Sequence, residues 1–243
     1  MIKLQYKVNK KIMFQSKITN YYNGNQCIYC HTDKIYILKD GRLKCGSCLK
    51  KYSLNKLQKD IDMLRLFALE IPANKSAKEV GYSYNLVKRR YNFFRKKIES
   101  YLQQNCELKN NILCVFEQNI TSLALGIIEQ DKKIFTTIVV NASPALLLED
   151  IKKTNQTGSV FFAPKFRSYA NLKFYGKYFP NNQNQKMTIS RIEGFWSFAK
   201  ERLHKYRGIN KNNFYYYLKE LEFRFNFNKE NLFQILFNII WPK

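Results

Sequence analysis

Apolar positions in the first half of the chain recur at helical spacing. Leu57, Ile61 and Leu64 lie three or four residues apart within residues 56–69, and Pro72 follows this segment. A spacing near 3.6 places side chains on one face of a helix, and proline cannot continue a helix. The pattern therefore predicts an amphipathic helix that ends before Pro72.

A second helix is predicted from residue 84 to about residue 104. Apolar side chains form a stripe along it, with basic and amide side chains between them; the stripe consists of Leu86, Val87, Tyr91, Phe94 and Ile98. Upstream, Ser76 and Ser83 are candidate N-caps, and Gly81 is a candidate turn residue between two helices. Residues 53–104 are therefore predicted to form a helix-turn-helix.

The pattern changes to strands beyond residue 111. Segments 121–129 and 133–140 are typical of strands, and the polar residues 130–132 between them form a hairpin turn. The other expected elements are a strand at 112–116, a helix at 144–153, a strand at 160–163, a loop at 180–188 and helices at 189–207, 213–227 and 230–240. This order predicts an α/β (mixed α+β) fold. It fits an RNase H-like domain over residues 112–243, although other folds share the same order.

Four cysteines are arranged as two pairs. Cys27 and Cys30 form one Cys-x-x-Cys pair, Cys45 and Cys48 form the other, and 14 residues separate the pairs. Each pair presents two thiolates on one turn, and two pairs complete the tetrahedral shell that structural zinc prefers. We therefore predict a zinc ribbon over residues 23–52, with a structural and not a catalytic metal. Four free thiols in a reducing compartment are the alternative.

The charge balance indicates a polyanionic partner. The chain has 42 Lys and Arg against 18 Asp and Glu, which gives a formal net charge of +24. Such an excess is typical of nucleic-acid binding, and double-stranded DNA is the expected partner. An AT-rich genome would also inflate lysine, but it does not account for the scarcity of acidic residues. Residues 1–22 are expected to be a basic leader without a secretory signal, and no apolar run is long enough for a membrane span.

The predicted second helix carries the candidate DNA contacts of this half. A cationic helix in the major groove reads base edges and contacts phosphates with the same set of side chains. The candidates are Asn85, Lys88, Arg89, Arg90, Asn92 and Arg95. A helix with a solvated basic face is the alternative.

The most specific string begins at residue 189. It reads ISRIEGFWSFAKERL, and it is followed by KYRGI at 205–209 and by LKELEFRFN at 218–226. These motifs closely resemble those of the ISXO-like insertion-sequence transposases, whose eukaryotic relatives are the Merlin elements. The zinc ribbon and the helix-turn-helix also sit where that family has them, so the resemblance covers about residues 23–243.

The resemblance implies an RNase H-like fold, DNA strand transfer and three acidic residues that hold two Mg²⁺ ions. Matched residue by residue, the acid on the helix is Glu193, and the family's lysine seven residues later is Lys200. The two strand acids correspond to Phe116 and Pro164, so two of the three acids are replaced. The site is therefore expected to be degenerate, with Glu193 either as a vestige or as an ion-pair partner of a nearby Lys or Arg.

The positive charge around the replaced acids also indicates that the metal site is degenerate. Residues 151–192 contain no Asp or Glu but eight Lys or Arg. Because a pair of Mg²⁺ ions needs several carboxylate oxygens, magnesium is not expected as a cofactor. The basic side chains Lys165, Arg167 and Lys200 instead become candidate phosphate contacts.

The sequence therefore predicts a transposase-derived DNA-binding protein whose nuclease and strand-transfer site is degenerate and, we expect, inactive. Two alternatives remain: an active transposase with a different set of acids, and a protein-interaction scaffold; self-association stays open. Cysteine usage predicts an intracellular, DNA-associated protein, in the nucleus if eukaryotic and in the cytoplasm or nucleoid if bacterial. No membrane and no small-molecule substrate are expected.

Overall fold

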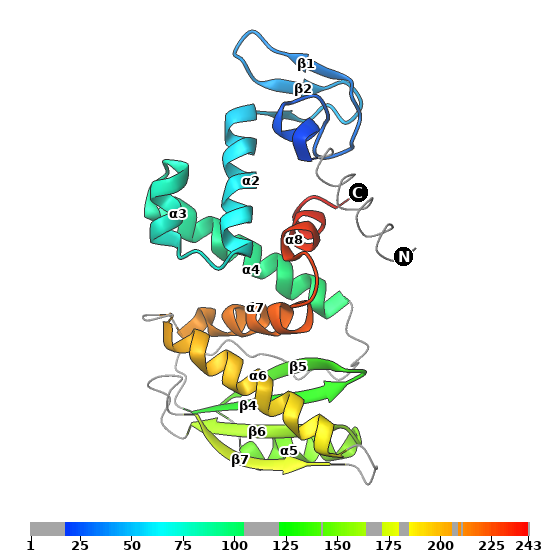
Figure 1. The fold of residues 1–243 in the computed structure, drawn as a ribbon, viewed down its shortest axis with the longest axis vertical. Coiled ribbons are helices and arrows are strands. Elements are labelled where there is room, and N and C mark those ends of the chain that lie inside the picture. Colours follow the sequence, from blue (N-terminus) through cyan, green and yellow to red (C-terminus); the bar gives the residue numbers. More distant parts are fainter. Residues whose placement is uncertain are drawn as a thin grey trace. The chain divides into compact units, whose positions relative to one another are not determined.

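The chain divides into two compact units (Figure 1). In the computed structural model, unit 1 comprises Met1–Lys97 with Glu230–Lys243, and unit 2 comprises Ile98–Lys229. The structure describes residues 18–104, 122–141, 143–163, 172–179, 185–205, 209 and 211–242. The strand predicted at 112–116 and the candidates Phe116, Pro164, Lys165 and Arg167 lie outside these residues. The last helix belongs to unit 1, whereas the sequence had placed it with the C-terminal domain.

Unit 1 begins with a small antiparallel sheet around the cysteines. Its strands are β1 (Ile35–Ile37), β2 (Leu43–Cys45) and β3 (Lys51–Tyr52), in the order β1-β2-β3. The turn between β1 and β2 needs Gly41, whose φ of 75° is in the left-handed region that favours glycine. The two cysteine pairs are therefore joined by a strand–turn–strand.

Unit 1 also contains a helical segment at residues 18–22 and four longer helices in its described part. They are α2 (Leu54–Ala68), α3 (Ala73–Val80), α4 (Tyr84–Gln104), which continues into unit 2, and α8 (Leu232–Ile240), which packs against α2. The side chain of Ser53 caps α2 by accepting a hydrogen bond from the Lys56 amide. Gly81 ends α3 in the left-handed conformation with φ 65°, and the Ser83 hydroxyl accepts a hydrogen bond from the Leu86 amide at the start of α4. Both helix boundaries agree with the sequence analysis.

The prediction that Ser76 is an N-cap is wrong. Pro72 is the N-cap residue of α3, and Ser76 is fully buried one turn into the helix. Its hydroxyl lies 2.7 Å from the Tyr91 hydroxyl, which in turn donates to the Ile71 carbonyl. Ser76 therefore joins α3 to α4 through a buried polar contact, which local sequence cannot reveal. The ring of Phe67 packs against the ring of Tyr91 in the apolar core, with their centroids 4.9 Å apart.

The described part of unit 2 is built on a four-stranded antiparallel sheet in the order β5-β4-β6-β7. The strands are β4 (Leu123–Gln130), β5 (Lys133–Val140), β6 (Thr157–Ala163) and β7 (Lys173–Tyr178). The hairpin between β4 and β5 turns at Asp131 and Lys132, which both have positive φ, as type I′ turns require. β6 is longer than the predicted 160–163, and β7 was not predicted.

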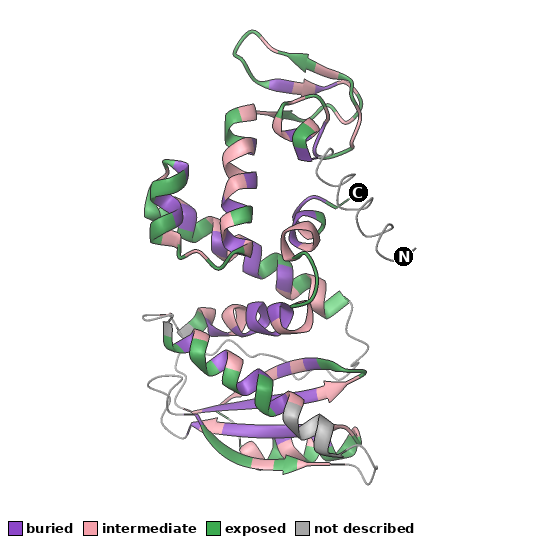
Figure 2. Cartoon of the chain, in the orientation of Figure 1, coloured by how far each residue is buried: buried purple, intermediate pink, exposed green. Residues whose placement is uncertain are grey.

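Helices cover both faces of this sheet (Figures 1 and 2). On one face, α5 (Pro144–Lys153) buries Leu147 and Ile151 against Ala124, Ile128 and Val160. On the other face lie α6 (Gln185–Lys205), the short 3₁₀ turn η2 (Lys211–Asn213) and α7 (Phe214–Asn226). Residues 123, 125 and 127 of β4 point to this second face, and 124 and 128 point to α5, so strand alternation divides the core into two layers. α6 begins at residue 185, within the loop predicted at 180–188.

Side chains of α7 cap the outer edge of β5. Glu222 Oε2 accepts hydrogen bonds from the Thr136 amide at 2.8 Å and from its hydroxyl at 2.6 Å. Lys219 Nζ donates to the Thr136 carbonyl at 2.7 Å and to Glu222 at 2.8 Å. The Asn226 side chain bonds both the amide and the carbonyl of Ile134. Because an open strand edge is a template for aggregation, these polar residues of the LKELEFRFN string have a structural role.

Candidate metal centre and nucleic-acid interface

The four cysteines predicted to bind zinc come together in unit 1. Their sulfur atoms all lie within 4.8 Å of one another. Sγ of Cys27 is 3.7 Å from that of Cys48, and Sγ of Cys30 is 3.4 Å from that of Cys45. A tetrahedral zinc with Zn–S bonds of about 2.3 Å separates its sulfurs by about 3.8 Å. The cluster therefore has the donor set and the spacing that a structural zinc needs.

The surroundings of the four sulfur atoms shift the pKa values of individual thiols in different directions. Burial raises the pKa of the Cys27 thiol to about 12. Burial also opposes ionisation of Cys45, but the backbone amides of Cys48 and Ser47 donate hydrogen bonds to its sulfur, and its pKa falls to about 6. A metal cation at the centre would stabilise the charged form of every thiol, so binding would release protons. Among the described residues, no other group of three Cys, His, Asp or Glu side chains could hold a metal ion.

The candidate DNA contacts on α4 separate into two groups. Asn85, Lys88 and Arg89 are exposed on the first turns of the helix. The other three are engaged within unit 1: Arg90 makes a 2.8 Å ion pair with Asp60, Arg95 is 5% exposed, and Asn92 Oδ1 accepts a hydrogen bond from Arg95. Only the first group is therefore available to a partner on the outer surface of α4.

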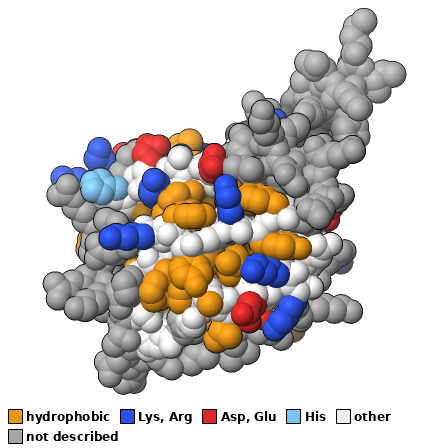
Figure 3. Space-filling view, turned by 90° about the horizontal axis from the view of Figure 1, so that it is seen from below, with side chains coloured by type: hydrophobic (Ala, Val, Ile, Leu, Met, Phe, Trp, Pro, Cys, Tyr) orange, Lys and Arg blue, Asp and Glu red, His pale blue; other side chains and the backbone are white. Residues whose placement is uncertain are grey.

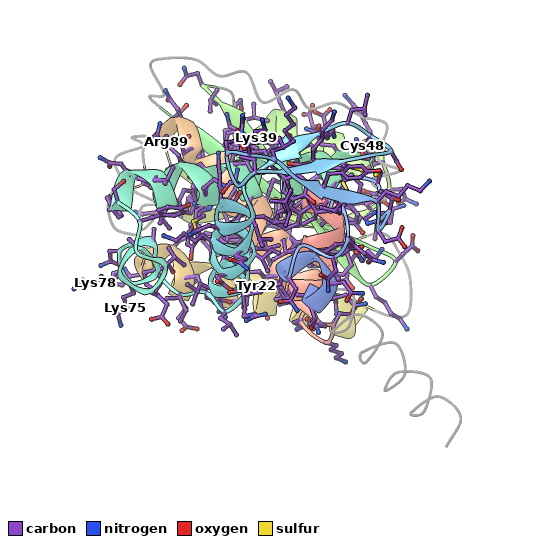
Figure 4. All side chains as sticks on the ribbon, turned by 90° about the horizontal axis from the view of Figure 1, so that it is seen from above. Tyr22, Lys39, Cys48, Lys75, Lys78 and Arg89 are labelled. Carbon is purple, nitrogen blue, oxygen red and sulfur yellow. The ribbon has the colours of Figure 1, made fainter. Side chains whose placement is uncertain are left out.

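Two lysines that the sequence analysis did not select lie on α3. Lys75 and Lys78 are both exposed, and Figure 4 shows them at the outer side of that helix, with Arg89 on α4. They are spaced i, i+3 and so share one face of α3. Their spacing was visible in the sequence, but only the position of α3 beside α4 identifies these two lysines as candidate DNA contacts.

A basic groove of about 690 Å³ lies between the ribbon and the helices of unit 1. Residues of the ribbon, α2, α4 and the end of α8 line it. Its charged side chains are Arg42, Lys50, Lys51, Lys56 and Arg90, with Asp60 as the single acid. Lys50 Nζ also lies 4.2 Å from the centre of the Tyr29 ring. These cations come from segments far apart in sequence, so no local motif identifies the groove.

A second groove, of about 760 Å³, lies in unit 2 between β6, β7 and α6. Glu193 and Lys200, matched above to the transposase motif, both line it, and both are exposed. Lys177 is the third charged residue of its lining. One carboxylate beside two ammonium groups does not fit a pair of Mg²⁺ ions, because such a pair needs several oxygen ligands. The described part of this groove therefore lacks a magnesium ligand set.

The sequence of this chain matches the family model of the ISXO2-like transposase domain over residues 85–226. The match covers more than half of the chain. The chain belongs to the ISXO2-like transposase family. It is also similar to an uncharacterized transposase-like protein of Haemophilus influenzae, with 37% identity over 103 residues, which covers 39% of this chain and 81% of that relative. No solved structure matches.

The region shared with the ISXO2-like transposase family has clear limits in the structure. It runs from the first turn of α4 to the last residue of α7, Asn226. It therefore includes the Glu193 groove and the cap on β5, whereas the cysteine cluster, α2, α3 and α8 lie outside it. None of the described helices combines the length and the apolar character needed to cross a membrane.

Proposed function

We propose that this ISXO2-like protein is a transposase-derived protein that binds duplex DNA through unit 1. The observation that carries the proposal is the exposed group Asn85, Lys88 and Arg89 at the start of α4. The α3–turn–α4 arrangement, with Gly81 in the turn, supports reading this pair as a helix-turn-helix whose second helix enters the major groove. Amide and guanidinium groups there can read base edges, while lysine contacts phosphates.

The ribbon and α3 extend this surface in the proposal. Lys75 and Lys78 supply further positive charge on α3, and the basic groove supplies four cations besides the Arg90–Asp60 ion pair, namely Arg42, Lys50, Lys51 and Lys56. Each phosphate that a cation neutralises releases counterions, so affinity rises with the number of contacts and falls steeply with salt. In this proposal, a structural zinc holds the ribbon segment that carries Lys50 and Lys51.

Removing charge from α4 tests the proposal. In Lys88→Ala/Arg89→Ala, we expect affinity for short duplexes to fall by roughly 10- to 100-fold at about 0.1 M salt, and the slope of log affinity against log salt to fall by about 2. Mobility-shift titrations between about 50 and 200 mM salt measure both. Lys152→Ala/Lys153→Ala, an exposed pair on α5 in unit 2, removes equal charge and is the control.

Three results of this experiment would count against the proposal. Equal losses in both double variants would mean that net charge alone attracts DNA. An unchanged affinity in the α4 variant would remove the helix-turn-helix assignment. A duplex shift that is absent, or insensitive to salt, would favour the protein-interaction scaffold.

We propose further that unit 2 is an RNase H-like domain whose catalytic centre is degenerate. Glu193 is the only acid among the described residues that line its groove, and Phe116 and Pro164 stand in sequence where the family has its other two. We expect purified protein with added Mg²⁺ or Mn²⁺ to leave DNA duplexes intact, and Glu193→Gln to bind them as the parent does. Gel assays on labelled duplexes check this. Cleavage that Glu193→Gln abolishes would instead establish an active transposase.

A further inference from the structure

The groove in unit 2 has an aromatic wall. The rings of Phe161 and Trp196 stack with centroids 4.3 Å apart and planes at 27°. The Phe174 ring meets Phe161 edge-on, with centroids 5.8 Å apart, and Phe179 also lines the groove. Phe161 and Trp196 are 7% and 9% exposed, whereas Phe174 is 57% exposed. The wall is thus anchored in the core at one end and open to solvent at the other.

A β-bulge gives Phe174 this position. Val160 pairs with Gly176 and Phe161 pairs with Phe174, so Tyr175 is an extra residue in β7. An extra residue twists a strand and redirects its side chains, and bulges are common beside functional sites. Here it leaves two adjacent aromatic side chains exposed, since Tyr175 is 47% exposed. Exposed rings in a cluster indicate a binding surface more than scattered apolar residues do.

Lysines lie beside the aromatic rings. Lys177 Nζ is 5.3 Å from the centroid of Phe179, and Lys200 Nζ is 5.8 Å from that of Trp196. Of the lining residues that the structure describes, Glu193 alone is acidic, so the described charges sum to a positive value. Figure 3, seen from the end of unit 2 where β7 lies, shows hydrophobic side chains in a patch with Lys and Arg among them. Rings beside cations complement a ligand that has flat apolar faces and negative charges.

Unpaired nucleotides have this combination of flat bases and charged phosphates. Base–aromatic stacking and lysine–phosphate contacts are the two interactions that single-strand binding surfaces combine. In a duplex the faces of the bases are covered by their neighbours, so a duplex offers the groove phosphates alone. The volume of about 760 Å³ falls within the range of about 300–1,000 Å³ typical of ligand sites.

We propose that this groove binds single-stranded DNA without magnesium. An unpaired base stacks on Phe174 at the open end of the wall, and Lys177 and Lys200 contact the phosphates on either side. This binding is independent of the duplex contacts proposed for unit 1, and it uses the groove in which Glu193 stands without enough carboxylates for a metal pair.

The two tryptophans of the chain allow a direct test. Trp196 lines this groove, and Trp241 lies in unit 1. In the full-length Trp241→Phe protein, emission reports on Trp196 alone. We expect oligothymidine, without added magnesium at about 50 mM salt, to quench it saturably, and a duplex of equal length to quench it much less.

Variants in the Trp241→Phe background locate the binding. We expect Phe174→Ala to weaken oligothymidine binding by roughly 5- to 150-fold, the range for loss of one stacked base. Lys177→Ala/Lys200→Ala should lower the salt slope by about 1.4, as two phosphate contacts to a single strand predict. Leu146→Ala, which truncates a side chain that is 58% exposed on α5, is the matched control and should bind as the parent does. Circular dichroism checks that each variant is folded.

Several outcomes would overturn the proposal. They are no Trp196 response to oligothymidine, a folded Phe174→Ala protein with parental affinity, or tighter binding of duplex or of oligouridine than of oligothymidine. Self-association that Phe174→Ala abolishes, without any oligothymidine response, would assign the groove to a second copy of the chain. Lys88→Ala/Arg89→Ala should leave the Trp196 response unchanged, so this proposal and the duplex proposal can fail separately.

Discussion

Replacing Cys45 with serine is expected to release zinc from the protein and to unfold the ribbon. The remaining three thiols cannot close a tetrahedral sulfur shell, and binding of a structural zinc contributes about 10–16 kcal/mol to small metal-dependent folds. Loss of Cys45 also removes the sulfur that receives two backbone hydrogen bonds. We expect zinc content to fall from about one ion per chain to near zero by metal analysis.

The control for this experiment is another cysteine of the same chain. Cys106→Ser changes a cysteine outside both Cys-x-x-Cys pairs and should keep the full zinc content. Duplex binding by Cys45→Ser should also weaken, because the ribbon loops carry part of the basic groove. A Cys45→Ser protein with one tightly bound zinc would contradict the assignment of the cluster.

Replacing Glu222 with leucine is expected to destabilise unit 2 by about 3–5 kcal/mol. Glu222 is 1% exposed, and its carboxylate accepts from both the amide and the hydroxyl of Thr136 as well as from Lys219. Without it, the Lys219 ammonium loses the carboxylate to which it donates a hydrogen bond and keeps only the electrostatic attraction of Glu99, and breaking a buried pair costs about this much. Urea denaturation of Trp241→Phe protein, followed through Trp196 emission, measures the change in unit 2.

Two companion variants separate charge from packing in this cap. Glu149→Leu changes an exposed glutamate on α5 and should alter stability by no more than about 0.5 kcal/mol. Lys219→Met/Glu222→Leu removes both charges and should recover part of the loss, because no ion is left buried alone. If Glu222→Leu unfolds at the same urea concentration as Glu149→Leu, the cap does not stabilise the sheet edge.

The sequence alone predicted those elements that are determined by residues close together in the chain. The period of α2 and α4, the Ser83 cap and the Asp131–Lys132 turn all depend on residues within a few positions of one another. The spacing of the cysteines likewise identified the metal cluster, since each pair lies on one turn. These features were predicted within a few residues.

Features that depend on distant partners were not predicted. β7 reads KFYGKY, and as an edge strand with a bulge it shows no clean alternation of apolar and polar positions. Arg90 and Arg95 looked equivalent to Arg89 in sequence. In the structure, however, Arg90 forms an ion pair with Asp60, which lies thirty residues earlier in the chain, and Arg95 is buried in the core. No local motif reveals either groove as a whole, because each is lined by several separate segments; the string that carries Glu193 and Lys200 supplies only the α6 side of the groove in unit 2.

The return of α8 to unit 1 sets an order for the synthesis of this protein. Tyr21 stacks on Phe237 with centroids 5.8 Å apart, and Arg65 of α2 lies over the ring of Phe233, so α8 completes the core that α2 begins. The ribosome makes all of unit 2 between these two helices, which takes on the order of ten seconds. During that interval α2 can pack on α3 and α4, but the part of α2 that contacts α8 is uncovered. A product that terminates early inside unit 2 would therefore carry the basic surface of unit 1 on an incomplete core.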